Sequence, residues 1–290
     1  MLALTLRNPV ASPLRYPGGK AKLFPFFSEL IQKNDLFGVE YCEPYAGGAG
    51  LAIRLLTGGF VERVRINDID SSVYAFWSAA LRDTDNFCKK IERTPITIVE
   101  WRRQKSIWMR GNAKNALELG FAAFYLNRTN RSGIIDGAGP IGGYAQNGEW
   151  KLDVRLVRDK HIKNLRELSR YADQITVTKL DAMRFFKSIA RDDRIFCYLD
   201  PPYFVKGHKL YKNFYEEEDH RNIAREVRRQ RKSKWVISYD DVLQIRRLYA
   251  GLKSTSYVLN YSAGKKGVGR EVMFASPMIE LPKVIDRGAN

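Results

Sequence analysis

Residues 39–70 read VEYCEPYAGGAGLAIRLLTGGFVERVRINDID, and this stretch decides the fold. A short apolar segment over 39–45 runs into the glycine-rich turn AGGAG, and a helix-like pattern, LAIRLL, follows. The next segment, 61–69, reads as a strand that ends in acidic residues. A strand, a glycine turn, a helix and a second strand with a terminal acid form a βαβ unit. The sequence therefore predicts an α/β fold.

Beyond this unit the chain divides into a helical part and a part that returns to strands. Long helical patterns fill residues 71–170. Strand-like segments follow at 174–178, 194–199, 234–238, 256–260 and 270–275. A connection of about a hundred residues is too long for a simple loop, which indicates a functional insertion. We therefore predict one domain formed by residues 1–70 and 171–290, interrupted by a mostly helical insertion over 71–170.

The insertion contains a glycine-rich stretch, SGIIDGAGPIGGYAQNGEW, at residues 132–150. Within it, Tyr144 and Trp150 flank Asn147-Gly148, a dipeptide that favours a tight turn between two strands. The sequence therefore predicts a hairpin inside the insertion.

The charge and the cysteine and histidine content of the chain indicate which kinds of partner to expect. Among 290 residues, 49 Lys and Arg outnumber 32 Asp and Glu, a net charge of +17 that attracts polyanions. Ribosome-associated and membrane-surface proteins share such an excess, so charge alone identifies no ligand. The three cysteines are dispersed without CxxC spacing, and the three histidines form no zinc pattern. No segment reaches membrane-spanning length, so we expect a cytoplasmic protein without a metal or a membrane partner.

The glycine turn is a candidate nucleotide site. Glycines let the backbone turn sharply and come close to a ligand, and Asp68 ends the following strand, where a carboxylate can accept hydrogen bonds from ribose hydroxyls. Asp181 follows the next strand-like segment and is placed to hold an adenine amino group. NAD and ATP compete as ligands, but their GxGxxG and GxxxxGK[ST] signatures are absent. The alternative is that the turn has no ligand.

A second motif, Asp200-Pro201-Pro202-Tyr203, follows the apolar strand RIFCYL directly. Two prolines make the turn rigid and remove two backbone donors. A carboxylate, a carbonyl and an aromatic ring then suit a planar group that bears an NH2: its hydrogens go to Asp200 and the Pro201 carbonyl, and its ring stacks on Tyr203. Such a clamp points the nitrogen lone pair at a methyl donor. The alternative is ordinary turn chemistry.

Together these residues resemble the Dam-like (D12 class) adenine-N6 DNA methyltransferases, a branch of the Rossmann-like class I methyltransferases that use S-adenosylmethionine and release S-adenosylhomocysteine. The resemblance runs in order through LRYPGGK, YCEPYAGGAG, INDID, FYLNRTNRSGI, DPPY and LYKNFY. It implies a helical target-recognition insertion, catalytic residues Asp200, Pro201, Pro202 and Tyr203, and no metal. The implied cofactor-binding residues are Tyr16, Lys20, Glu43, Pro44, Tyr45, Gly47, Gly48, Asp68, Asp181 and Asp200.

The resemblance also implies contacts with double-stranded DNA and a target base flipped out of the helix. The expected contact residues are Tyr203, Tyr211, Arg128, Asn130, Arg131 and Ser132. The basic stretch 220–235 is expected to be a solvated helix that faces away from DNA. A cognate restriction endonuclease is an expected partner if the enzyme belongs to a restriction–modification system. Methylation of RNA adenine or DNA cytosine N4, and a catalytically silent DNA-binding relative, remain alternatives.

Two departures from the family pattern stand out. Ala49 occupies a position where the family usually has glycine, and we expect Gly48 and Gly50 to compensate. The recognition segment carries SGIIDGAGPIGG, unlike the hairpin of enzymes that read GATC, so GATC specificity is not carried over.

Overall fold

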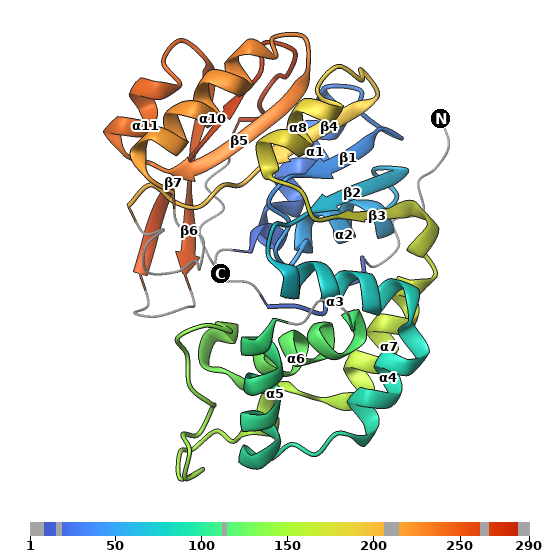
Figure 1. Ribbon diagram of the computed structural model, residues 1–290. Helices are drawn as coiled ribbons and strands as arrows, with labels where there is room; N and C mark the ends of the chain where they lie inside the picture. The colour runs from blue at the N-terminus through green and yellow to red at the C-terminus, as the bar shows by residue number, and fades with distance from the viewer. Residues whose placement is uncertain (1–8, 16–18, 112–114, 206–214, 262–266, 284–290) are drawn as a thin grey trace.

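The computed structural model describes residues 9–15, 19–111, 115–205, 215–261 and 267–283. These residues build a mixed sheet of seven strands in the order β3-β2-β1-β4-β5-β7-β6 (Figure 1). The strands are β1 (Glu40–Glu43), β2 (Arg63–Asn67), β3 (Ile175–Thr178), β4 (Ile195–Leu199), β5 (Lys234–Asp240), β6 (Lys253–Tyr261) and β7 (Gly267–Ala275). The first five in this order pair in parallel, whereas β7 is antiparallel to both β5 and β6. This order confirms the predicted class I methyltransferase fold.

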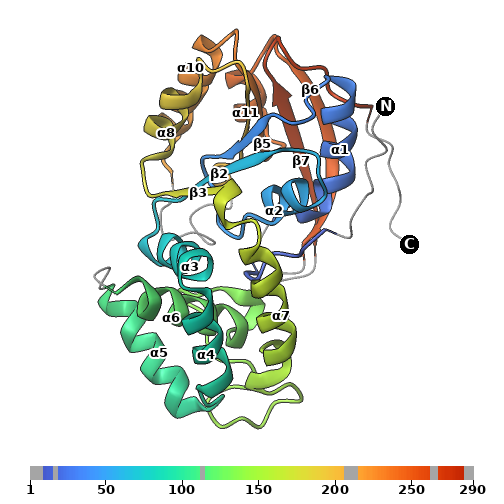
Figure 2. The same ribbon diagram turned by 90° about the vertical axis from the view of Figure 1, so that its right-hand side faces the viewer.

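Alternating side chains of the central strands pack into two separate cores. Tyr41 and Phe196 point to one face, where they meet α1 (Phe24–Lys33) and α2 (Gly50–Thr57). Their neighbours Cys42 and Cys197 point to the other face. That face is covered by α8 (Ala182–Ile189), α10 (Glu217–Arg229) and α11 (Leu243–Leu248) (Figure 2). The sheet is therefore buried on both sides, as its apolar strands require.

The residues between β2 and β3 form a second body beside the sheet (Figure 1). Its helices are α3 (Ser71–Arg82), α4 (Thr84–Arg93), α5 (Ile98–Arg110), α6 (Ala116–Thr129) and α7 (Arg158–Ser169). Asp70 begins α3 by accepting the backbone N–H of Ser72 at 2.7 Å. Gly120 lets α6 approach α3 closely, because a Cβ there would lie 2.5 Å from the carbonyl oxygen of Ala75.

The glycine-rich stretch of the insertion differs from the predicted hairpin. Residues 141–146 form consecutive turns, and strand pairing in the described part of this stretch is a single bridge between Asn130 and Pro140. Gln146 explains the difference, because its side-chain amide donates to the carbonyls of Ile141 (2.7 Å) and Gly143 (2.6 Å). These bonds close a compact loop in place of a ladder.

None of the helices in the described ranges is long and apolar enough to cross a membrane.

Candidate active site

The site lies at the point between β1 and β4 where the strand order of the sheet reverses. The strands β1 and β4 are adjacent and parallel, with Cys42 opposite Cys197, yet their chains continue to opposite sides of the sheet. Ligands of open α/β sheets bind at such a switch point, beyond the carboxyl ends of the strands. The turn after β1 and the turn after β4 therefore begin side by side. These are the glycine turn and the Asp-Pro-Pro-Tyr turn.

The glycine turn is held by the acid at the end of the next strand. Asp68 accepts the backbone N–H of Gly47 through Oδ2 and that of Asp70 through Oδ1, both at 2.9 Å. Burial outweighs these two donors and raises the pKa of Asp68 to about 6. From outside, the indole N–H of Trp77 donates to the Gly47 carbonyl at 3.0 Å, and Ser12 donates to the Gly48 carbonyl at 2.5 Å. Both carbonyls are thereby fixed.

The alanine in this turn adopts the conformation that glycine prefers. Ala49 has φ +44°, in the left-handed region, as does Gly47 at +46°. The expectation that Gly48 and Gly50 would compensate for Ala49 is therefore wrong, because Ala49 itself adopts the strained backbone. Gly50 is constrained for another reason: a Cβ there would lie 3.1 Å from the Cβ of Ala21.

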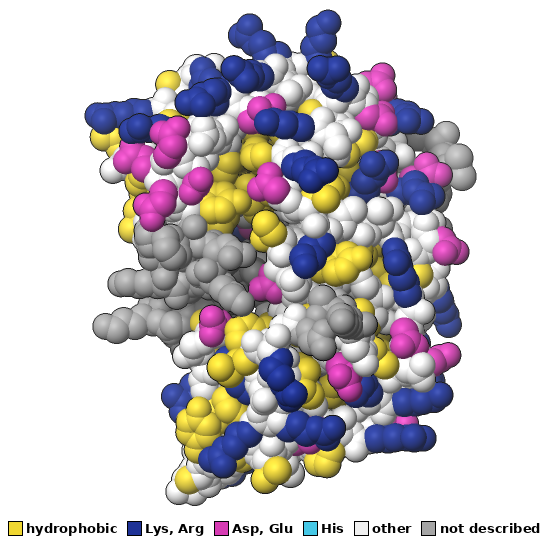
Figure 3. Space-filling view, viewed as in Figure 1, with side chains coloured by type: hydrophobic (Ala, Val, Ile, Leu, Met, Phe, Trp, Pro, Cys, Tyr) yellow, Lys and Arg dark blue, Asp and Glu magenta, His cyan; other side chains and the backbone are white. Residues whose placement is uncertain are grey.

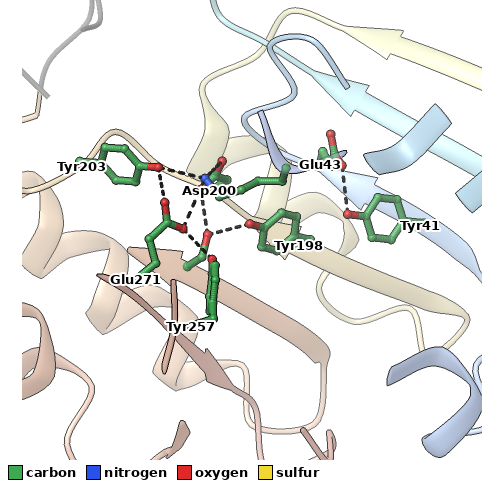
Figure 4. Close-up of polar contacts among 9 residues, drawn as sticks. Tyr41, Glu43, Tyr198, Asp200, Tyr203, Tyr257 and Glu271 are labelled. Atoms are coloured by element: carbon green, nitrogen blue, oxygen red, sulfur yellow. Dashed lines mark hydrogen bonds and ion pairs between the residues drawn. The ribbon is translucent and has the colours of Figure 1, made fainter. Parts of the chain in front are cut away.

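A buried carboxylate lies under the glycine turn. Glu43, 5% exposed, accepts the Tyr41 hydroxyl at 3.0 Å and the backbone N–H of Ala52 at 3.2 Å (Figure 4). Burial raises the pKa of Glu43 to about 8; the Tyr41 bond opposes this rise, and the charge of Asp200 adds to it. The charge of Asp200 in the second turn therefore affects the pKa of Glu43 beside the first turn.

Asp200 lies at the end of β4 between a cation and a hydroxyl. Lys20 donates to Oδ2 at 2.8 Å, and Ser238 donates to Oδ1 at 2.8 Å. The Ser238 hydroxyl is in turn 2.7 Å from that of Tyr198. Burial raises the pKa of Asp200, and the charge of Lys20 opposes the rise. Two ionised carboxylate oxygens offer about four lone-pair sites, so Asp200 keeps acceptor capacity beyond these two bonds.

The rest of the Asp-Pro-Pro-Tyr turn is anchored by two other carboxylates. Tyr203 donates its hydroxyl to Glu271 at 2.5 Å, and its ring is 2% exposed. The backbone N–H groups of Phe204 and Val205 donate to the two oxygens of Asp240 at 2.8 and 3.0 Å. The turn is therefore fixed through both a side chain and its backbone.

These turns carry the motifs of a known family. The family model for D12 class N6 adenine-specific DNA methyltransferases matches residues 16–261, most of the chain and both turns. The protein belongs to this family. As a D12 class methyltransferase it is an S-adenosylmethionine-dependent enzyme that modifies adenine N6 in DNA.

Comparisons with individual protein sequences and solved structures add less about function than the family model does. No curated protein sequence matches it. Among solved structures it is similar to the rRNA methyltransferase aviRa from Streptomyces viridochromogenes, at 14% identity and a TM-score of 0.41, over 96% of this chain and 92% of that one. It is also similar to a Legionella pneumophila protein, at 10% identity and a TM-score of 0.33, over 89% and 85% of the two chains.

The remaining predicted cofactor residues of the methyltransferase lie at the same edge of the sheet. Asp181 is exposed and caps α8 by accepting the backbone N–H of Arg184 at 2.9 Å. The Pro44 carbonyl accepts the side-chain amide of Asn67 at 2.9 Å. Tyr45 lies with its hydroxyl 3.4 Å from that of Tyr215.

Lys20, also predicted to contact the cofactor, reaches the Asp-Pro-Pro-Tyr turn, and its cofactor contact stays a prediction. Besides Asp200, it donates to the Tyr203 hydroxyl at 3.2 Å and lies 3.7 Å from Glu271. Tyr16 and Tyr211 lie outside the described residues, and their roles stay predictions.

The predicted DNA contacts of the enzyme separate into buried and accessible residues. Arg128 is buried and donates to the Pro13 carbonyl; burial, with the neighbouring charges of Arg15 and Arg155, lowers its pKa to about 10. Asn130 is fully buried and accepts the Trp101 indole N–H at 2.6 Å. The structure therefore gives Arg128 and Asn130 a supporting role in place of the predicted contact with DNA.

Arg131 and Ser132 follow directly and remain accessible. Arg131 is exposed, and Ser132 is half-buried with φ +57°. The loop that the buried pair supports therefore presents these two side chains to solvent.

Four polar residues of the site were not found from the sequence. Asn67, fully buried at the end of β2, links the turns after β1 and β3 by bonding the Pro44 carbonyl and the backbone N–H and carbonyl of Leu180. Ser238, Asp240 and Glu271 come from β5 and β7. The available signal was a polar residue inside an apolar strand, such as the glutamate in REVMFA.

No group of His, Cys, Asp and Glu side chains in the described ranges is arranged to hold a metal ion.

Proposed function

We propose that this D12 class enzyme binds S-adenosylmethionine at the glycine turn and directs its methyl group to N6 of an adenine held at Asp200-Pro201-Pro202-Tyr203 in duplex DNA. One observation carries the proposal. The two turns follow adjacent parallel strands, in which Cys42 lies opposite Cys197, and the charge of Asp200 contributes to the raised pKa of Glu43. A donor and an acceptor held at these turns would therefore meet in one place.

The residues around the glycine turn fit a nucleoside with a cationic group. Each oxygen of Asp68 accepts one backbone N–H, which leaves lone pairs for two ribose hydroxyls. Asp181 uses Oδ1 to cap α8 and is exposed at this edge of the sheet, so its carboxylate would accept an adenine amino group through its remaining lone pairs. The carboxyl groups of Glu43, which is buried, and Asp200, which is half-buried, favour a positive charge nearby. S-adenosylmethionine supplies a methyl carbon made electrophilic by a sulfonium sulfur.

Asp200 acts on the amino group that receives the methyl. An exocyclic amino nitrogen has its lone pair delocalised into the base and is a weak nucleophile. When Asp200 and the Pro201 carbonyl accept its two hydrogens, the nitrogen is favoured in pyramidal geometry, with its lone pair aimed away from these acceptors. A nitrogen becomes strongly acidic only once it is alkylated, so no strong general base is needed. Asp200 is then an adjacent acceptor for the proton.

The target base must leave the helix to reach Asp200. Extruding a base costs a few kcal/mol, which hydrogen bonds and stacking in the site offset. Stacking on Tyr203 requires its ring to become accessible, because the ring is 2% exposed here. Lys and Arg side chains are spread over both bodies on the face seen in Figure 3, which suits a polyanion that spans them.

Transfer of a labelled methyl group to enzymatically amplified DNA tests the proposal. Such DNA contains many sequences and no earlier methylation, so the unknown recognition sequence is no obstacle. We expect label in N6-methyladenine, and none in DNA amplified with a purine nucleotide that lacks the 6-amino group.

Parallel reactions with total RNA, and analysis of the methylated nucleosides, separate the alternatives. Label in RNA adenine or in cytosine N4 would refute the substrate proposed here, and DNA binding without transfer would favour a catalytically silent relative. The expected restriction endonuclease partner stays a prediction, because no described residue bears on it.

A further inference from the structure

A second carboxylate, Glu271 on β7, lies behind the catalytic turn. Its side chain is fully buried, in a strand whose next residues Val272, Met273 and Phe274 are apolar and buried as well. A buried carboxylate is costly unless it is paired and hydrogen-bonded. A glutamate at this position therefore requires a reason beyond packing.

The partners of Glu271 come from three separate parts of the fold (Figure 4). Tyr203, from the catalytic turn, donates to Oε1 at 2.5 Å. Tyr257, directly opposite on β6, donates to Oε2 at 2.6 Å. The ammonium group of Lys20 lies 3.7 Å from the same Oε2. Bonds of this length are typical of hydroxyls that donate to an ionised carboxylate.

Lys20 connects this carboxylate with the catalytic one. Its ammonium lies 2.8 Å from Asp200, 3.2 Å from the Tyr203 hydroxyl and 5.2 Å from the centre of the Tyr203 ring. Within this buried cluster one cation is shared by two carboxylates, so Asp200 does not hold the whole charge of Lys20. Its oxygens remain better hydrogen-bond acceptors than those of a carboxylate with a cation of its own.

We propose that Glu271 is a positioning residue for methyl transfer, which holds the Tyr203 hydroxyl and shares Lys20 with Asp200. It acts through these two side chains and does not touch the reacting atoms. This inference rests on the proposed function of Asp200. It predicts that removal of the charge of Glu271 slows transfer more than it weakens ligand binding.

The substitution Glu271→Gln tests the role with little change in size. We expect kcat to fall roughly tenfold to hundredfold, the effect of weakening hydrogen bonds to a charged group, with KM values for cofactor and DNA changed less than about threefold. S-adenosylhomocysteine affinity, measured by calorimetry, should be similarly retained. Glu218→Gln, at an exposed position on α10, is the matched control and should leave kcat unchanged.

The pH profile of kcat separates positioning from simple structural support. The groups that face Asp200 are Lys20, Glu43, Tyr198, Ser238 and Glu271. Burial first, and the charge of Glu271 in addition, raise the pKa of Asp200, whereas Lys20 opposes this rise. Removing the charge of Glu271 should therefore move the acidic limb of the profile to lower pH. A variant that is merely less stable would lose amplitude without moving the limb.

A double-mutant cycle with Tyr203→Phe completes the test. If Glu271 acts through the Tyr203 hydroxyl, the double variant should lose much less activity than the product of the two single losses. Tyr257→Phe removes one donor and keeps the charge, and serves if Glu271→Gln fails to fold; we expect a smaller loss of kcat with the acidic limb displaced toward higher pH.

Unchanged kcat, additive losses or an unmoved acidic limb would each overturn the inference. The kcat of each variant relative to wild type, and its pH profile, are measured on whichever nucleic acid accepts the methyl group. Wild-type transfer to a base other than adenine would thus refute the proposed substrate without deciding the role of Glu271.

Discussion

The edge of the sheet and the helical insertion both bury charged side chains, but these side chains have charged neighbours of opposite sign in the first region and of like sign in the second. At the sheet edge Lys20 lies between Asp200 and Glu271, so the buried charges are of opposite sign. In the insertion Arg128 has Arg15 and Arg155 as its charged neighbours, and within the described ranges it forms no ion pair with a carboxylate. The difference indicates separate tasks: the first region holds the Asp200 carboxylate, which we propose to be catalytic, in position, and the second supports a loop in a positive field.

The largest effect should come from the carboxylate at the sheet edge. We expect Asp200→Ala to lower kcat at least roughly a hundredfold to a thousandfold, because it removes a positioned acceptor used during transfer. DNA binding should persist, since the basic surface is untouched. Transfer assays and equilibrium binding measure the two properties. Asp193→Ala, exposed just before β4, is the control; activity in Asp200→Ala equal to that of the control would contradict the mechanism.

On the insertion, the exposed member of the loop should govern DNA affinity. Arg131→Ala should weaken DNA binding severalfold and reduce the slope of log affinity against log salt by about one, the loss of one phosphate contact. Arg225→Ala, exposed on α10, should change neither. Titrations at several salt concentrations measure both slopes. A reduced slope for Arg225 alone would place DNA on the other face of the sheet.

A further effect concerns the pH dependence of cofactor binding. Asp68 has a pKa of about 6, and ribose hydroxyls bond better to its ionised form. As pH falls through this value the carboxylate must lose a proton to bind, so affinity should decrease by up to about tenfold per pH unit. Calorimetry with S-adenosylhomocysteine between pH 5 and 8 measures the decrease. Asp68→Asn should bind more weakly and flatten the dependence; an equally steep decrease in that variant would assign the titration to another group.

The smallest effect concerns the backbone strain at Ala49 in the glycine turn. Because Ala49 has φ +44°, Ala49→Gly should stabilise the protein by about 1 kcal/mol, the cost of the left-handed region for a residue with a Cβ. Thermal unfolding should shift upward by about 2–4 °C. A decrease would mean that the freedom glycine adds to the unfolded chain outweighs the relieved strain.

The comparison also explains what could be predicted from sequence. The turns at residues 43–50 and 200–203 are local, since each follows its strand directly, and the predicted strands and class I fold were confirmed. Glu271 was missed because its partners Tyr203 and Lys20 are distant in the chain and meet only when β7 joins the sheet.

In the insertion, Arg128 and Asn130 were predicted to contact DNA because arginine and asparagine are usually exposed. Both side chains instead bond to neighbouring segments, Arg128 to the Pro13 carbonyl and Asn130 to Trp101. The predicted hairpin failed for a related reason. The sequence predicts the turn at Asn147-Gly148, but the turns form at residues 141–146, because the bonds from the Gln146 side chain that close the loop depend on tertiary position.

The central claim is that the tip of β4 holds an adenine amino group in line with a methyl donor bound beside it. Single-molecule sequencing of DNA from cells that express the protein tests this most directly, with cells that express Asp200→Ala for comparison. The account predicts N6-methyladenine within one short recurring sequence in the first sample and none in the second. Methylated cytosine, or N6-methyladenine that persists in the variant, would contradict it.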